Sequence, residues 1–105
     1  MATIKIANRH QFQEAIQQGV ALIDFNAAWC APCRAQAPII EKIAAELQGK
    51  ALVAEANVDD NIDSAKEYGI QSIPTLILFK DGKEIQRFVG LQPEALLTQT
   101  ILQTL

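Results

Sequence analysis

The stretch from residue 20 to residue 47 changes from the pattern of a strand to that of a helix. Cys30 and Cys33, the two cysteines of the chain, lie at the change. The first part is almost entirely apolar, which is typical of a strand covered on both faces. Apolar residues then recur every three or four positions, as in an amphipathic helix. We therefore expect a strand over residues 20–28 and a helix from about Cys33 to Leu47.

The rest of the chain repeats this alternation and then departs from it. Asp81-Gly82 between two strand-like runs predicts a hairpin, and Pro38 predicts a kink or an early break in the second helix. The further predicted segments are a strand over 3–6, a helix capped by Asn8, a strand over 51–58, a helix over 62–68, strands over 74–79 and 84–89, and a final helix starting at Pro93. This order predicts an α/β fold, a three-layer α/β/α sandwich whose central mixed five-stranded sheet is flanked by four helices.

Length and composition narrow the class of protein. With 105 residues, half of them hydrophobic and a fifth charged, the chain is expected to form one globular domain over residues 1–105. The net charge is −3 and the basic residues are scattered, so we expect no nucleic-acid partner. No apolar run reaches the roughly 18–20 residues that span a membrane, and no secretory signal is visible at the start. We therefore expect a cytoplasmic protein that does not insert into membranes; a periplasmic protein whose signal had been removed is the alternative.

The spacing of the cysteines indicates reactive thiols. A thiol attacks as its thiolate, and a helix N-terminus stabilises that anion through free N–H groups and the helix dipole. Cys30 lies where those donors point, and Cys33 follows about one turn later, close enough to form a disulfide. An inert buried pair and half of a metal site are the alternatives. Zinc needs four ligands, however, and the chain offers these two cysteines and the distant His10.

Two further residues are notable on their own. Asp24 is a carboxylate inside an apolar run, which is costly unless the group is neutral, hydrogen-bonded or functional. The alternative is a strand residue whose side chain reaches solvent or a backbone donor. Pro74 opens a predicted strand, which by itself is an ordinary place for proline.

The chain resembles the thioredoxin family along essentially its whole length. The resemblance rests on a series of motifs in the family's order: Asp24-Phe25, Trp29-Cys30-x-Pro32-Cys33, Ala37-Pro38, Tyr68-Gly69-Ile70, Ile73-Pro74-Thr75, Phe79-Lys80-x-Gly82 and Val89-Gly90. Such a series is far more specific than a Cys-x-x-Cys motif alone. It implies a thioredoxin-like fold and a thiol–disulfide oxidoreductase that reduces protein disulfides, with Cys30 as an exposed attacking nucleophile and Cys33 as a sheltered resolving thiol.

The resemblance also assigns roles around the pair. It implies that Asp24 is buried behind Cys33 and exchanges protons with it. It further implies a cis bond between Ile73 and Pro74, packed against the disulfide, where the backbone of Ile73 pairs with an extended substrate segment. The residues expected to form a largely apolar docking surface for substrate are Trp29, Pro32, Ile73, Pro74 and Gly90.

The expected partners are disulfide-containing proteins and an NADPH-dependent flavoprotein thioredoxin reductase that recycles the oxidised form. The resemblance implies a monomer that carries no cofactor and no metal. Proline between the cysteines, where isomerase-like relatives have histidine, favours a reductant by analogy. The alternatives are a thioredoxin-fold module whose binding depends on its redox state, and a metal or iron–sulfur site shared by two chains.

Three positions depart from the family's pattern and are expected to tune the site. Ala31 stands where glycine is usual between the cysteines, and Asn26 replaces the first of two neighbouring tryptophans. Glu55 stands where a lysine near the buried aspartate is common. If Glu55 approaches Asp24, two carboxylates replace an ion pair and the pKa of Asp24 should rise further.

Overall fold

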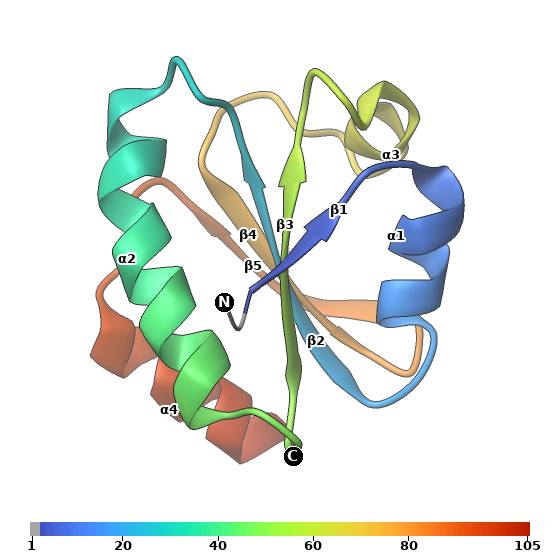
Figure 1. The fold of residues 1–105 in the computed structure, drawn as a ribbon. Helices are drawn as coiled ribbons and strands as arrows, with labels where there is room; N and C mark the ends of the chain where they lie inside the picture. The colour runs from blue at the N-terminus through green and yellow to red at the C-terminus, as the bar shows by residue number, and fades with distance from the viewer. Residues whose placement is uncertain (1–2) are drawn as a thin grey trace.

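A five-stranded mixed sheet separates two layers of helices (Figure 1). The computed structural model describes residues 3–105. Its elements in chain order are β1 (Ile4–Ile6), α1 (Arg9–Ile16), β2 (Val20–Asn26), α2 (Ala31–Glu46), β3 (Leu52–Asn57), α3 (Ile62–Glu67), β4 (Thr75–Lys80), β5 (Lys83–Val89) and α4 (Glu94–Thr104). The strands lie in the order β1-β3-β2-β4-β5. Strands β1, β3 and β2 are parallel, β4 pairs antiparallel with β2, and β5 pairs antiparallel with β4. The predicted fold class is confirmed.

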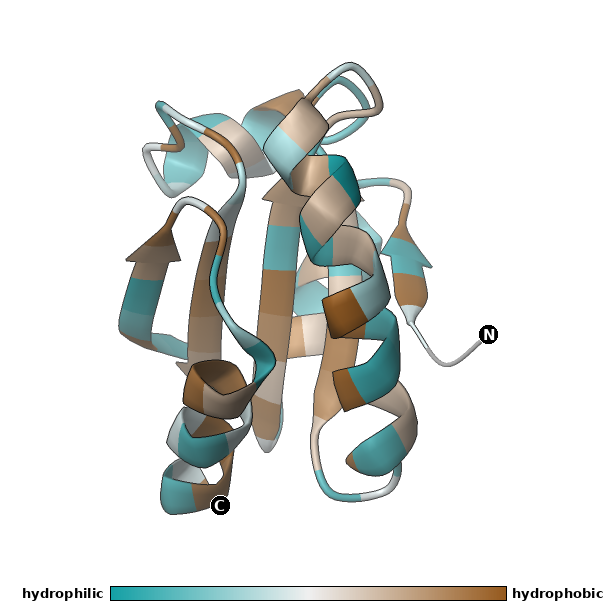
Figure 2. Ribbon diagram, turned by 90° about the vertical axis from the view of Figure 1, so that its left-hand side faces the viewer, coloured by the Kyte–Doolittle hydropathy of each residue, from teal (hydrophilic) through white to brown (hydrophobic). Residues whose placement is uncertain are grey.

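The two helical layers cover opposite faces of the sheet. Helices α2 and α4 lie on one face, and α1 and α3 lie on the other (Figure 1). Alternate residues of β2 enter the two cores: Leu22 packs in the core under α2, whereas Ile23 packs in the core that contains Phe12 of α1. Viewed from the α2 side, the central strands are mostly hydrophobic, and the edge strands carry more hydrophilic colour (Figure 2). By the same alternation, Asp24 lies on the α2 face.

Helix α2 begins two residues earlier than predicted, at Ala31, and continues through Pro38 to Glu46. The predicted early break at Pro38 is therefore wrong. Proline cannot donate the backbone hydrogen bond to the carbonyl four residues earlier, that of Arg34. Both residues are exposed, so water can reach this turn of the helix and the break is not required.

The other elements differ from prediction mainly at their ends. Strand β2 ends at Asn26 instead of residue 28, and the strand predicted over 51–58 is β3, Leu52–Asn57. The hairpin is confirmed, with Asp81 and Gly82 both at positive φ, the backbone of a two-residue turn that fits twisted strands. Within residues 3–105, no helix combines the length and the apolar character needed to cross a membrane.

Candidate active site

Cys30 and Cys33 form a disulfide at the start of α2. Cys30 is the N-cap residue of the helix, with extended backbone, and residues 27–29 connect it to the carboxyl end of β2. The backbone N–H of Cys33 donates to Cys30 Sγ at 3.2 Å. An N–H group at a helix N-terminus therefore points at the sulfur on which a thiolate would form.

Both cysteines are buried in this oxidised form. Cys30 is 6% exposed and Cys33 is 3% exposed, and both pack in a small cluster with Ala27, against Val58 and Ile73. The prediction of an exposed Cys30 is therefore wrong. Segments from distant parts of the sequence cover this residue. The two sulfurs differ in their surroundings instead. Cys30 Sγ lies 3.7 Å from the carbonyl oxygen of Ile73, whereas Cys33 borders a hollow that Ile73 does not line.

Asp24 is buried on β2, with 1% of its surface exposed. Asn26 Nδ2 donates to one carboxyl oxygen at 3.5 Å, and the other oxygen, Oδ1, has no hydrogen-bond partner. Burial raises the pKa of Asp24 to about 7; the Asn26 hydrogen bond opposes this rise and the negative charge of Glu55 adds to it. The negative charge of Glu55 thus acts on the pKa of Asp24 in the predicted direction, although burial is the larger cause. A carboxyl group with this pKa can accept or donate a proton near neutral pH.

A hollow of about 280 Å³ lies beside Cys33, and we call it the rear hollow. It is lined by Lys5, Asn26, Ala27, Ala28, Cys33, Arg34, Ala37, Glu55 and Asn57. This volume accommodates several water molecules, at about 30 Å³ each. Asp24 does not line the hollow, but Asn26 does, and Asn26 is hydrogen-bonded to Asp24. The structure thus gathers Asn26, Glu55 and Cys33 around one hollow.

Trp29 and Ile73 line a second hollow of about 360 Å³, which shares no lining residue with the rear hollow and which we call the front hollow. Trp29 is 69% exposed, and its indole Nε1 donates to Asp59 Oδ2 at 3.2 Å. The peptide bond between Ile73 and Pro74 is cis, as the resemblance implied. The side chain of Pro74 is buried, whereas Ala31 and Pro32 are exposed at the start of α2.

Gly90 lies next to Pro74, because its N–H donates to the Pro74 carbonyl at 2.8 Å. Its φ of 91° lies in the left-handed region that favours glycine. Val89 and Leu91, which flank it, are 58% and 49% exposed. Sequence reasoning singled out Gly90 and missed these two neighbours, although an outward-facing apolar residue at the end of an edge strand was a usable signal.

Sequence reasoning also missed Gln36, a fully buried polar residue of α2. Its amide oxygen accepts from the Gln92 N–H at 2.7 Å and its Nε2 donates to the Gln92 carbonyl at 3.1 Å. These two bonds attach the loop after Gly90 to the helix that carries the cysteines. No local signal predicts a contact across 56 residues of sequence.

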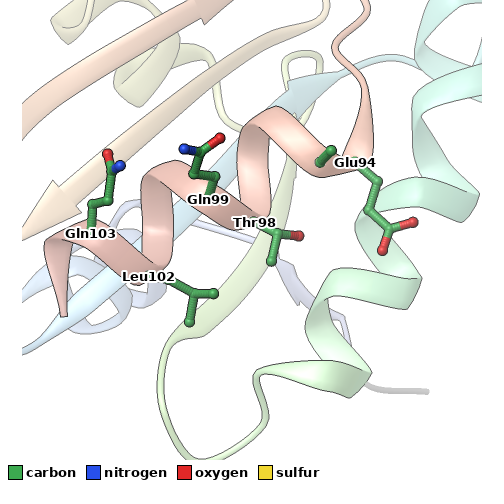
Figure 3. Close-up of a pocket in the computed structure, with 6 residues that line it drawn as sticks. Glu94, Thr98, Gln99, Leu102 and Gln103 are labelled. Carbon is green, nitrogen blue, oxygen red and sulfur yellow. The ribbon is translucent and has the colours of Figure 1, made fainter.

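The remaining surface features do not suggest another reactive centre. Among residues 3–105 there is no group of three or more His, Cys, Asp or Glu side chains that could hold a metal ion. A hollow of about 620 Å³ runs along α4, where Glu94, Thr98 and Leu102 are among its lining residues (Figure 3). Its one charged lining residue, Glu94, forms an ion pair with Lys42 at 3.2 Å, and no nucleophilic cysteine reaches it.

A disulfide formed by a Cys-x-x-Cys pair at a helix N-terminus, on a mixed sheet between two helical layers, defines a thiol–disulfide oxidoreductase. The comparisons with known proteins agree with this class. The Thioredoxin family model matches residues 3–103. A curated thioredoxin from Staphylococcus aureus is 42% identical over 101 residues, which cover 96% of each chain.

Solved structures show the same similarity. A variant thioredoxin from Halobacterium salinarum superposes with a TM-score of 0.90 at 35% identity, covering 97% of this chain and 89% of the other. A Malassezia sympodialis thioredoxin gives a TM-score of 0.87 at 34% identity, covering 97% and 90%. The chain belongs to the thioredoxin family. It is a protein-disulfide reductase that works through the Cys30–Cys33 dithiol and disulfide.

Proposed function

We propose that Cys30 is the attacking thiol and Cys33 the resolving thiol. The Cys30 thiolate attacks a substrate disulfide, one substrate sulfur leaves as a thiolate, and a mixed disulfide remains. Cys33, once deprotonated, attacks Cys30 Sγ, forms the Cys30–Cys33 disulfide and releases the second substrate thiolate. The assignment is supported by the Cys33 N–H, which points at Cys30 Sγ from 3.2 Å, and by the position of Cys30 at the N-cap of α2.

Asp24 is the general base and acid for Cys33. It lies on the face of the sheet that α2 covers, and its pKa of about 7 leaves it half ionised at neutral pH. It can therefore take the Cys33 proton before the resolving attack and return one when the disulfide is reduced again. Asn26 and Glu55 tune this exchange, since the first donates to Asp24 and the second raises its pKa. Ala31 stiffens the loop between the cysteines through its extra methyl group.

Substrates dock on the surface around the front hollow. Trp29 and Ile73 line that hollow, and Pro32 is exposed beside them on α2. An extended substrate segment pairs with the backbone of Ile73, next to Pro74 and Gly90. The exposed apolar side chains on this side favour unfolded or extended protein segments that carry a disulfide.

The oxidised protein is recycled by an NADPH-dependent flavoprotein thioredoxin reductase, and the protein itself needs no cofactor. It acts as one domain and as a monomer in the cytoplasm, the compartment in which protein thiols are kept reduced. These assignments follow from membership of the family.

The observation that carries the proposal is the asymmetry of the pair, and trapping tests it. A Cys33→Ser variant mixed with a disulfide-containing protein should accumulate a covalent complex through Cys30, visible on a non-reducing gel and lost with dithiothreitol. Cys30→Ser is the matched control and should trap nothing. Equal trapping by both variants, or trapping through Cys33 alone, would show that the roles are assigned incorrectly.

A further inference from the structure

Three titratable side chains lie side by side across the sheet, on the face that α2 covers. Asp24 of β2 is the register partner of Glu55 of β3, and Glu55 is the register partner of Lys5 of β1. Neighbouring strands lie about 4.8 Å apart, so each side chain starts next to the following one. Exposure rises along the row: Asp24 is buried, Glu55 is half-buried and Lys5 is exposed at the edge strand. The row therefore leads from the buried carboxyl group to solvent.

The rear hollow joins this row to the reactive pair. Cys33, Glu55 and Lys5 all line it, and Asn26 lines it while donating to Asp24. The other charged side chain at the hollow is Arg34, whose guanidinium donates to the Ala28 carbonyl at 3.0 Å. On the remaining side, β4 places the apolar Leu76 opposite Asp24. Water that enters the rear hollow would therefore meet the Glu55 side chain.

We infer that Glu55 carries the proton of the Asp24–Cys33 pair to water in the rear hollow, with Lys5 beside it at the exposed end of the row. This inference rests on the proposed role of Asp24. A buried carboxyl group with one unpartnered oxygen has no direct path to bulk water, and it must lose its proton before it can act as a base again. The neighbouring carboxylate offers that path, and the negative charge of Glu55 already acts on Asp24.

The resolving step moves one proton from Cys33 to Asp24 and on to the rear hollow. The Cys33 thiol gives its proton to the Asp24 carboxylate, and the Cys33 thiolate attacks Cys30 Sγ. The Cys30–Cys33 bond forms, the bond between Cys30 and the substrate sulfur breaks, and the substrate thiolate leaves with the electron pair and takes a proton from water. Asp24 then passes its proton to Glu55, and Glu55 releases it into the hollow. The dithiol is oxidised and the substrate disulfide is reduced.

The test follows the resolving step by itself. When the reduced protein reacts with one equivalent of Ellman's reagent, attack by Cys30 releases a first thionitrobenzoate and attack by Cys33 releases a second, both read by absorbance. Glu55→Gln keeps the shape of the side chain but cannot carry a proton. We expect an unchanged first phase and a second phase slowed by roughly 10-fold, less than the loss of a direct general base because water remains a slower acceptor.

Small proton carriers should restore the lost rate. In Glu55→Gln the second phase should accelerate with imidazole or formate concentration at constant pH, whereas the wild type should not respond. Lys5→Gln removes the positive charge beside Glu55 and should move the midpoint of the pH profile of the second phase upward. Glu46→Gln on the last turn of α2 and Lys83→Gln on the opposite edge strand are the matched controls and should change nothing.

The outcomes separate this inference from the proposed function on which it rests. If Asp24→Asn slows the second phase but Glu55→Gln does not, Asp24 is the base and the relay through Glu55 is wrong. If Glu55→Gln slows the phase without any response to added buffer, Glu55 has a structural role only and the relay is again wrong. If Asp24→Asn leaves the second phase unchanged, the proposed base is wrong and the relay fails with it.

Discussion

An Asp24→Asn substitution removes a buried charge and keeps the shape of the side chain, so it isolates the cost of that charge. The pKa of Asp24 is about 7 in the folded protein against 3.8 for the ordinary group, and burial is the main cause. At about 1.4 kcal/mol per pH unit, the difference corresponds to about 4 kcal/mol of free energy of unfolding. Because the side chain is only 1% exposed, solvent screening does not reduce this value.

The free energy of unfolding depends on pH because the folded and unfolded states bind the Asp24 proton with different affinities. The folded protein binds it more tightly than the unfolded chain, so this contribution to wild-type stability is complete below about pH 3.8. It is lost as the pH rises to about 7. The asparagine variant has no such loss. Its free energy of unfolding should match that of the wild type near pH 3.5 and exceed it by about 4 kcal/mol at pH 8.5.

Urea denaturation of the oxidised proteins at several pH values measures this difference, since the disulfide-bonded cysteines do not titrate. Asp60→Asn, at an exposed aspartate, is the control and should show no such pH dependence. A stability gain of the same size at pH 3.5 and pH 8.5 would refute the reasoning, because it would assign the gain to packing instead of charge.

The other predictions concern the substrate surface and the attachments of α2. Trp29→Ala should lower kcat/KM for a protein disulfide while leaving the urea midpoint nearly unchanged, because the indole is 69% exposed. Gln36→Leu should lower the free energy of unfolding by about 1–3 kcal/mol, because it leaves the partly buried N–H and carbonyl of Gln92 without their partner. Lys42→Ala should cost less than about 1 kcal/mol, since its ion pair with α4 is exposed to solvent.

Local patterns were enough to predict the layers of the fold. The continuous apolar run of β2 indicated a strand buried on both faces, and the Asp81-Gly82 turn fixed the hairpin. The end of a helix is less determined locally, because tertiary contacts can override a breaker. Pro38 lies on an exposed part of α2, where the missing hydrogen bond costs little.

The residues of the site could be predicted from the sequence, but which of them lie next to one another in the folded protein could not. The sequence indicated that Asp24 carries an energetic cost, but its place beside Glu55 depends on the register of two strands separated by α2. The burial of Cys30 depends on Ile73, 43 residues away. The bonds between Gln36 and Gln92 likewise join distant segments, and neither glutamine lies in a recognisable motif.

The most direct test of the central claim is turnover of a protein disulfide. Reduction of insulin by dithiothreitol, followed as turbidity, should be accelerated by catalytic amounts of the wild-type protein. The Cys30→Ser variant, which keeps the same proposed docking surface, should not accelerate it. Failure of the wild type to exceed dithiothreitol alone would contradict the account. It would instead indicate a thioredoxin-fold module that binds partners according to the state of the Cys30–Cys33 pair without reducing them.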